Sequence, residues 1–202
     1  MTEDAAIRRL TEAVRRLAGY TAGRATTGRS HDDADDVAGT VNTDDAHGFD
    51  PLPLLGALHR GGAPVVVIGQ VAGIMHGSAE LTGDLDLLWT GDADRASSMA
   101  EVFSAAGAFL AGADGGPVAC DAAAFGLPKV LFRTDRASGD CCTPALAWGG
   151  IPVREMMARA QTAVAADGAV VRYLDLADLI RMRRAVGRPK DLRRAAELER
   201  LR

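Results

Sequence analysis

Apolar positions recur along the chain with two spacings, which predict an alternation of helices and strands. Apolar residues three or four positions apart indicate helices at 2–18, 51–60, 71–76, 93–106, 155–164, 176–186 and 190–201. Short apolar or alternating runs indicate strands at 65–68, 84–89, 129–134, 140–142 and 169–173. We therefore predict an α+β fold: a small mixed β-sheet with flanking helices and a C-terminal helical segment.

The stretch 20–48 interrupts this pattern, because it is dominated by Asp, Thr, Gly and Ser. The sequence thus predicts an N-terminal helix within 1–19, a flexible acidic linker over 20–48 and a folded domain over 49–202. The linker contains a metal-like cluster of side chains: His31, Asp32, Asp33, Asp35 and Asp36. A flexible acidic run is the favoured interpretation, since nothing fixes the geometry of these ligands.

Composition narrows the functional classes. Aromatic residues make up only 4% of the chain, which disfavours extensive stacking on nucleic-acid bases, and the net charge of −4 argues against a general nucleic-acid coat. The charge is uneven, however. Residues 172–202 carry ten basic and five acidic side chains, whereas 63–171 carry six and twelve. This order suits a site that binds a metal and then an anionic substrate; a solvated helix face is the alternative.

The cysteines and the hydropathy pattern indicate a reduced, cytoplasmic protein without a membrane segment. The three cysteines, Cys120, Cys141 and Cys142, are odd in number and form no C-x-x-C pair, so they indicate neither a disulfide framework nor a zinc site. No apolar run approaches the length that spans a bilayer, and the N-terminal residues lack the apolar core of a signal peptide.

The stretch 65–89 carries the most informative chemistry. A buried strand leads into a glycine turn at Gly69, a short helix, and a second strand that opens with Gly-Asp-Leu-Asp. Side chains alternate along a strand, so Asp84 and Asp86 point to the same side and repel each other. A divalent cation between them would relieve that repulsion. Backbone N–H groups after Gly69 and the hydroxyl of Ser78 could hold a phosphate.

A third carboxylate would complete such a site. Asp140 is the best candidate, because it opens a strand beyond 129–134 and would reach the same edge if that hairpin lies beside Asp84 and Asp86. Asp121 and Asp135 are weaker candidates. The competing interpretation of the Asp84 and Asp86 pair is two surface carboxylates at the start of a strand.

At these residues the chain resembles a known family, the nucleotidyltransferases of the polymerase-β type. It is most similar to small prokaryotic members associated with toxin–antitoxin and abortive-infection systems. The resemblance covers about residues 50–202 and rests on five segments in order: Val-Ile-Gly-Gln-Val-Ala at 67–72, His-Gly-Ser at 76–78, Thr-Gly-Asp-Leu-Asp-Leu-Leu at 82–88, Gly-Asp-Cys-Cys at 139–142, and the basic pattern over 176–192.

The resemblance implies the nucleotidyltransferase fold and transfer of a nucleoside monophosphate from a nucleoside triphosphate (NTP), with Mg²⁺ or Mn²⁺. The acceptor would be a protein such as a partner toxin or antitoxin, a tRNA or a small molecule. Asp84, Asp86 and Asp140 would be the catalytic residues and metal ligands. The expected nucleotide-binding residues are Gly69, Gln70, Ser78 and Lys190.

Two residues depart from the family pattern and favour an alternative function. Gln70 stands where a small residue usually follows the glycine, and Glu80 places a negative charge where a basic or polar residue is common. The alternative is a catalytically inactive antitoxin or regulatory binding module with the same fold.

Overall fold

The computed structural model of the chain describes residues 3–30, 34 and 39–202. Its α-helices in this part are α1 (Ala5–Thr21), α2 (Leu52–Arg60), α3 (Gly69–His76), α4 (Ala93–Ala105), α5 (Ala122–Phe125), α6 (Val153–Ala158), α7 (Leu176–Val186) and α8 (Pro189–Glu199). Its strands are β1 (Val65–Val67), β2 (Leu87–Trp89), β3 (Phe109–Ala111), β4 (Pro117–Val118), β5 (Lys129–Arg133), β6 (Ser138–Cys142), β7 (Gln161–Val164) and β8 (Val170–Tyr173). Two short 3-10 turns, η2 (Thr40–Asn42) and η3 (Asp44–Ala46), precede α2.

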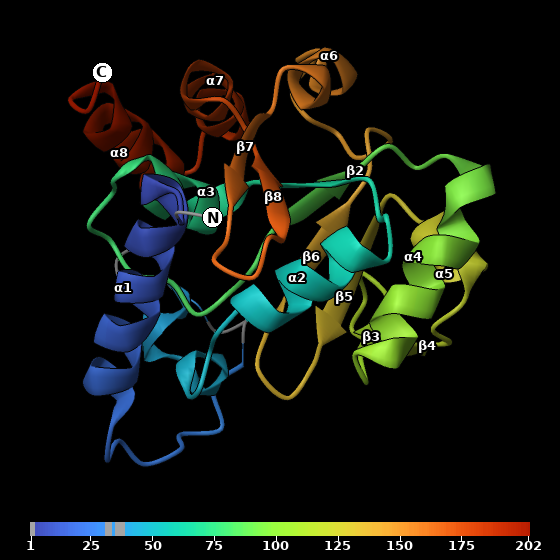
Figure 1. Cartoon of the computed structure of the whole chain (residues 1–202), viewed down its shortest axis with the longest axis horizontal. Helices are drawn as coiled ribbons and strands as arrows, with labels where there is room; N and C mark the ends of the chain where they lie inside the picture. Colours follow the sequence, from blue (N-terminus) through green and yellow to red (C-terminus); the bar gives the residue numbers. More distant parts are fainter. Residues whose placement is uncertain (1–2, 31–33, 35–38) are drawn as a thin grey trace.

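The strands form one mixed sheet in the order β4-β3-β5-β6-β2-β1-β8-β7 (Figure 1). Strand β2 runs antiparallel to β1 and parallel to β6, and β1 runs parallel to β8. The other neighbouring pairs are antiparallel. The structure therefore confirms the predicted α+β class with a mixed sheet, and its two central strands are β6 and β2.

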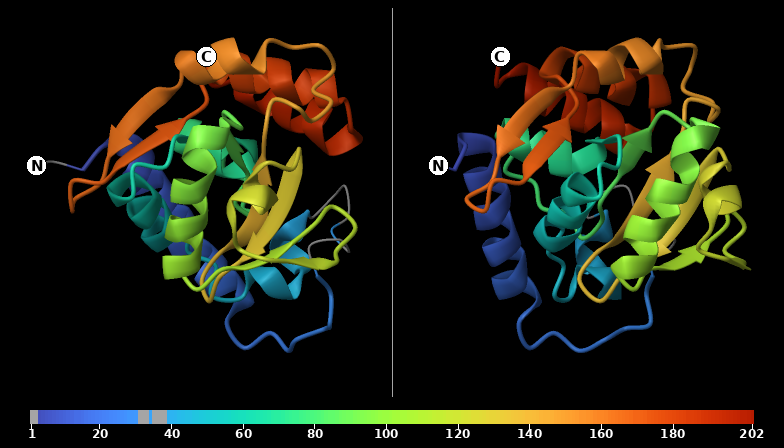
Figure 2. Two further views of the ribbon diagram at one scale, coloured as in Figure 1. Left: turned by 90° about the vertical axis from the view of Figure 1, so that its right-hand side faces the viewer. Right: turned by 45° about the vertical axis from the view of Figure 1, so that its right-hand side comes forward.

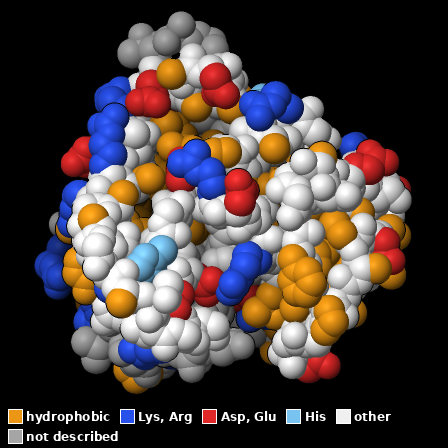
Figure 3. Space-filling view, turned by 90° about the horizontal axis from the view of Figure 1, so that it is seen from below, with side chains coloured by type: hydrophobic (Ala, Val, Ile, Leu, Met, Phe, Trp, Pro, Cys, Tyr) orange, Lys and Arg blue, Asp and Glu red, His pale blue; other side chains and the backbone are white. Residues whose placement is uncertain are grey.

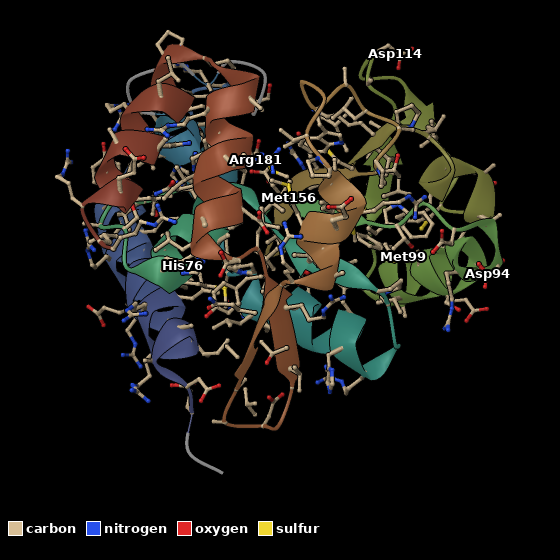
Figure 4. All side chains as sticks on the ribbon, turned by 90° about the horizontal axis from the view of Figure 1, so that it is seen from above. His76, Asp94, Met99, Asp114, Met156 and Arg181 are labelled. Carbon is tan, nitrogen blue, oxygen red and sulfur yellow. The ribbon has the colours of Figure 1, made fainter. Side chains whose placement is uncertain are left out.

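The helices pack in two groups. Helices α2, α4 and α5 pack together, and they meet the sheet at β8 and β5. Helix α3 packs against both α1 and α7, and α7 packs along α8 (Figure 2). Seen from above, α8, α7 and α6 lie side by side, with Arg181 on α7 and Met156 on α6 (Figure 4). Residues of α3, α7 and α8 from this second group line the cavity described below.

One hydrophobic core connects the sheet with the helices. The three residues of β1 and the three of β2 are all buried, as expected for apolar runs covered on both faces. Helix α1 contributes Ile7, Leu10 and Leu17 to this same core, each only 1% exposed. The N-terminal helix therefore packs onto the elements of 49–202.

Several element predictions are wrong in detail. The helix expected over 155–164 ends in the structure with α6 at Ala158, and Gln161–Val164 forms the edge strand β7 beside β8. The β-branched Thr162 and Val164 suit a strand, and the pairing with β8 supplies its hydrogen bonds. Strand β2 begins at Leu87 rather than at Asp84, and β6 begins at Ser138, two residues before the predicted start at Asp140.

The stretch 107–126, for which the sequence predicts no element, contains β3, β4 and α5. Part of the stretch expected to be a linker also carries local structure. Arg24 donates hydrogen bonds to the backbone oxygens of Val41 and Thr43, and Asp44 accepts from the backbone N–H groups of Thr27 and Gly28. The proposed acidic cluster, His31, Asp32, Asp33, Asp35 and Asp36, lies outside the described residues.

Two further expectations concern nucleic-acid binding and membrane-spanning helices. Seen from below, acidic and basic side chains are interspersed over much of the surface, and hydrophobic side chains gather on one side (Figure 3). This face therefore lacks the continuous basic surface of a general nucleic-acid binder. Within the described ranges, no helix combines the length and the apolar character needed to cross a membrane.

The junction of β2 and β6 leaves no space for a side chain at position 139. A Cβ atom on Gly139 would overlap the backbone of Leu85. We expect Gly139→Ala to lower the free energy of unfolding by about 1–3 kcal/mol, the usual cost of overpacking. Urea unfolding measures this change. Gly19→Ala is the control, because its Cβ would meet nothing within 4 Å. Equal stability of Gly139→Ala and the wild type would show that the junction tolerates the extra atom.

Candidate functional site

Parallel pairing of β2 with β6 places Asp86 beside Asp140. Leu87 pairs with Cys141, so the preceding residues of the two strands are also neighbours. The backbone of Leu85 extends the pairing, because its N–H donates to the oxygen of Ser138 (2.9 Å) and its oxygen accepts from the N–H of Asp140 (3.2 Å). Asp84, Asp86 and Asp140 all line one cavity of about 290 Å³. The structure thus brings the three predicted carboxylates together.

The first carboxylate is held by two threonine hydroxyls. Thr40 donates from Oγ1 to Oδ1 of Asp84 at 2.9 Å, and the Thr82 hydroxyl donates to the same oxygen. The backbone N–H of Gly83 donates in turn to the Thr40 hydroxyl (2.9 Å). Thr40 lies in η2, within the stretch expected to be a linker. Sequence reasoning missed it, because a single threonine in a polar stretch gives no signal of a distant partner.

The glycine turn allows Asp86 to lie against the first residue of α3. Gly69 has a φ of +62°, which favours glycine, and a Cβ atom there would overlap the carboxylate of Asp86. The N–H of Ile68 donates to the backbone oxygen of Asp86 at 2.9 Å. Gly69 and Gln70 both line the cavity of the three carboxylates. The start of α3, with its unpaired N–H groups, therefore lies at the site.

The side chain of Gln70 links neighbouring elements by hydrogen bonds at the wall of this cavity. It is 3% exposed, and its Nε2 donates to Oγ of Ser78 (3.0 Å) and to the backbone oxygen of Glu80 (2.8 Å). Its Oε1 accepts from Nη2 of Arg183 at 2.9 Å. The side chain of Gln70 is thus buried and held by hydrogen bonds to its neighbours.

Ser78 is the one predicted nucleotide-binding residue that the structure does not bring to the site. Its hydroxyl accepts from Gln70 and donates to Oε1 of Glu197 at 2.9 Å. Ser78 is not among the described residues that line the cavity of the three aspartates. Its hydroxyl joins α3 to α8 instead of pointing at a phosphate.

A basic wall faces the aspartates across the same cavity. Its side chains come from the α7–α8 corner: Arg183, Arg188, Lys190 and Arg194. Gly187, with a φ of +72°, ends α7, and α8 starts at Pro189, so the corner directs these residues to one place. Lys190 was predicted here. Sequence reasoning did not single out the three arginines, although the excess of basic residues over 172–202 includes them.

Ion pairs to the buried Asp191 hold Arg183 and Arg188 of the basic wall in position. Arg183 is 4% exposed and donates from Nη2 to the backbone oxygen of Gly69 at 2.9 Å. Asp191 accepts from Nε of Arg188 at 2.6 Å and lies 3.5 Å from Nη1 of Arg183. Burial and the nearby charge of Arg194 lower the pKa of Arg183 to about 10, so it remains protonated at neutral pH. The glycine turn and the basic wall therefore form one connected unit.

Glu80 is neutralised by α8. Its carboxylate accepts from Nη1 of Arg193 at 2.6 Å and from Nε of Arg194 at 2.7 Å. Burial acts to raise the pKa of Glu80, but the hydrogen bonds from the two arginines outweigh it, and the net pKa is lowered. Glu80, which departs from the pattern of the family that the chain resembles, is thus paired with two arginines.

Burial and the neighbouring carboxylates strongly affect the pKa of Asp86. Burial, followed by the charges of Asp84 and Asp140, raises the pKa of Asp86 to about 8. The carboxylate of Asp140 lies 2.6 Å from Nζ of Lys129, the first residue of β5. Lys129 was also missed from the sequence, because only the pairing of β5 with β6 brings it to the aspartates.

The three aspartates share a cavity but do not form a ready-made ligand set. Among the described residues, no group of three or more His, Cys, Asp and Glu side chains is arranged to hold a metal ion. The carboxyl pair of Asp84 and Asp86 nevertheless has the chemistry that a hard divalent cation prefers. Burial and the neighbouring carboxylates raise the pKa of Asp86, so an added positive charge would favour its ionised form.

A second cavity of about 290 Å³ adjoins the first. The two cavities share Gly69, Asp86, Asp140, Arg183, Arg188 and Asp191. Much of the remaining wall of the second cavity is apolar: Leu146, Trp148, Leu179, Met182 and Val186. The neighbouring carboxylates Asp86 and Asp140 therefore stand at the junction of a charged cavity and a largely apolar one.

Comparison with known proteins adds no family assignment, because no protein-family model and no curated protein matches this chain.

The raised pKa of Asp86 predicts a pH-dependent loss of stability in metal-free protein. The folded state holds this proton up to about pH 8, whereas the unfolded state releases it near the ordinary value of 3.8. The contribution to stability is therefore complete below about pH 4 and is lost as the pH rises through 8. We expect Asp86→Asn to lack this loss, so its melting temperature should gain on the wild type from pH 5 to 9.

Thermal unfolding in the presence of a chelator measures this difference. Asp135→Asn is the control, since Asp135 is an exposed carboxylate in the turn between β5 and β6. Parallel curves for the wild type and Asp86→Asn would contradict the burial of a protonated carboxyl at this position.

Proposed function

We propose that this protein is a metal-dependent nucleotidyltransferase, which transfers a nucleoside monophosphate from an NTP to an acceptor hydroxyl. One observation carries the proposal: three aspartates and a basic wall face each other across a single cavity beside the glycine turn of α3. A nucleoside triphosphate with its divalent cation needs both kinds of group, carboxylates for the cation and positive side chains for the phosphates.

Different residues of the cavity would have different roles in such a reaction. The acceptor oxygen forms a bond to the α-phosphorus, the bond from that phosphorus to the bridging oxygen breaks, and pyrophosphate leaves. Mg²⁺ held by Asp84 and Asp86 would polarise the α-phosphate. Arg183 and Lys190 lie where they can offset the negative charge of the departing phosphates.

Asp140 is the candidate to receive the proton of the acceptor hydroxyl. Its Oδ1 is buried and has no hydrogen-bond partner within the described part of the chain, while Oδ2 is paired with Lys129. The unpartnered oxygen can accept a hydrogen bond from the hydroxyl as it attacks. This supports the role that the family resemblance implies for Asp140.

The two adjoining cavities suit two reactants. In-line transfer requires the attacking and leaving oxygens to lie on opposite sides of the α-phosphorus. If the triphosphate occupies the charged cavity with its leaving end at the basic wall, the acceptor approaches across Asp86 and Asp140 from the second cavity. The apolar walls at Trp148, Met182 and Val186 favour an acceptor that carries an apolar group beside its hydroxyl.

The inactive alternative loses its specific support. It depends on Gln70 and Glu80, which depart from the family pattern. In the structure, Gln70 is bonded to Ser78 and Arg183, and Glu80 is paired with Arg193 and Arg194. Gln70 lines the cavity with its side chain engaged in these hydrogen bonds, and the paired carboxylate of Glu80 is not among the described residues that line it.

The direct test is transfer of label from NTPs. We expect the protein, with Mg²⁺ or Mn²⁺ and each α-labelled NTP in turn, to label an acceptor in cell extract. Asp84→Asn and Asp86→Asn should each reduce transfer by about 100-fold or more, since losing a ligand exceeds the 10–100-fold cost of changing its outer partners. Asp135→Asn should leave transfer unchanged. No label transfer and no metal-dependent NTP binding by the wild type would refute the proposal.

The proposed role of the second cavity in holding the acceptor leads to a second prediction. Val186 lines the apolar cavity and is 40% exposed, whereas Leu192 is 49% exposed and is not among the described residues that line it. We expect Val186→Arg to lower transfer to the acceptor by about tenfold, because losing 1–2 kcal/mol of apolar contact corresponds to such a factor. Its NTP affinity, measured by equilibrium binding, should stay the same.

Leu192→Arg adds the same charge nearby and should change neither quantity. A loss of NTP affinity in Val186→Arg would instead assign the apolar cavity to the nucleoside, and equal losses in both variants would show a general effect of the added charge.

A further inference from the structure

Lys129 places a positive charge inside the acidic cluster. Its Nζ lies 2.6 Å from Oδ2 of Asp140, and the two side chains are 28% and 12% exposed. Lys129 pairs in register with Cys142 across β5 and β6, two residues from Asp140. It also lines the second cavity together with Asp86 and Asp140. The lysine is therefore built into the site by strand pairing.

The charges around this lysine keep it protonated. The ammonium of Lys129 forms an ion pair with the carboxylate of Asp140 at 2.6 Å, and this contact favours the charged form of the lysine. The cluster thus contains a fixed cation before any metal arrives.

This lysine conflicts with a ligand set of three aspartates. A divalent ion binds carboxylate oxygens at about 2.0–2.1 Å in the case of Mg²⁺, and paired ions stand about 3.5–4 Å apart. The ammonium of Lys129 already contacts Oδ2 of Asp140 at 2.6 Å, so an ion cannot occupy that side of the carboxylate. In agreement, no three-carboxylate metal group is arranged among the described side chains.

We propose that the ammonium of Lys129 takes the place of a second divalent ion. The site then holds one divalent ion at Asp84 and Asp86, and Lys129 supplies the second positive charge beside Asp140. This inference rests on the proposed metal-dependent transfer and specifies how many ions the site binds. Lys129 is a positioning residue, since it acts through Asp140, whose Oδ1 stays available for the acceptor.

The number of bound ions tests the inference. We expect chelator-treated full-length protein, titrated with Mn²⁺ and followed by calorimetry and electron paramagnetic resonance, to bind one ion. Lys129→Met should bind two, because the freed carboxylate of Asp140 becomes a ligand of the second. Lys129→Arg keeps the charge and should bind one. Circular dichroism establishes that each variant is folded.

The chain offers a matched control. Its other lysine, Lys190, lines the charged cavity but belongs to the basic wall. Lys190→Met removes the same charge from the adjoining cavity and should still bind one ion. The rate of label transfer should depend on a single ion in the wild type and on two in Lys129→Met.

Every other outcome contradicts either the role of Lys129 alone or the transferase proposal as well. Two ions in the wild type, with label transfer intact, overturn the role of Lys129 and leave the transferase proposal standing. One ion in folded Lys129→Met, or two in Lys129→Arg, also overturn that role. An absence of bound Mn²⁺ in the wild type, with and without an NTP, overturns both proposals together.

Discussion

The parallel pairing of β2 with β6 is the constraint on which the site depends. The backbone of Leu85 is bonded to Ser138 and to Asp140, and this register places Asp86 next to Asp140. The pairing is possible only because Gly139, opposite Leu85, has no side chain. Two carboxylates are therefore forced together by hydrogen bonds and buried apolar neighbours, and the remaining groups of the site can be understood as responses to their repulsion.

The groups that contact these carboxylates come from several separate parts of the chain. Thr40 and Thr82 hold Asp84, the start of α3 lies against Asp86, and Lys129 pairs with Asp140. These contacts do not remove the repulsion, since the pKa of Asp86 remains raised to about 8. A cluster with such a raised pKa would be stabilised by added positive charge, and the proposal of a bound divalent ion draws on this property.

The sequence allows part of this site to be predicted. The two-residue spacing of Asp84 and Asp86 is a local pattern, and period-2 alternation is enough to relate these two residues. A strand opening at Asp140 is also a local pattern, but only the pairing of β2 with β6 brings Asp140 to the other two. Gly69 and Lys190 are also recognisable from local turn chemistry and charge. By contrast, Thr40, Lys129 and Arg183 reach the site through partners 44, 11 and 114 positions away, and no local pattern specifies such contacts. The same reason explains the edge strand Gln161–Val164, whose hydrogen bonds come from β8.

The α7–α8 corner links the two halves of the site energetically. Arg183 joins the backbone oxygen of Gly69 and the side chain of Gln70 to Asp191, and Asp191 also holds Arg188. A movement of α8 would therefore disturb the glycine turn against which Asp86 lies. Buried charges that lose one partner are strongly destabilised, so this network favours a single arrangement of the basic wall. The residues that depart from the family pattern, Gln70 and Glu80, are both members of these contacts. Their side chains tie α3 and the following loop to α7 and α8, so the departures are explained by the way the basic wall is held against the aspartates.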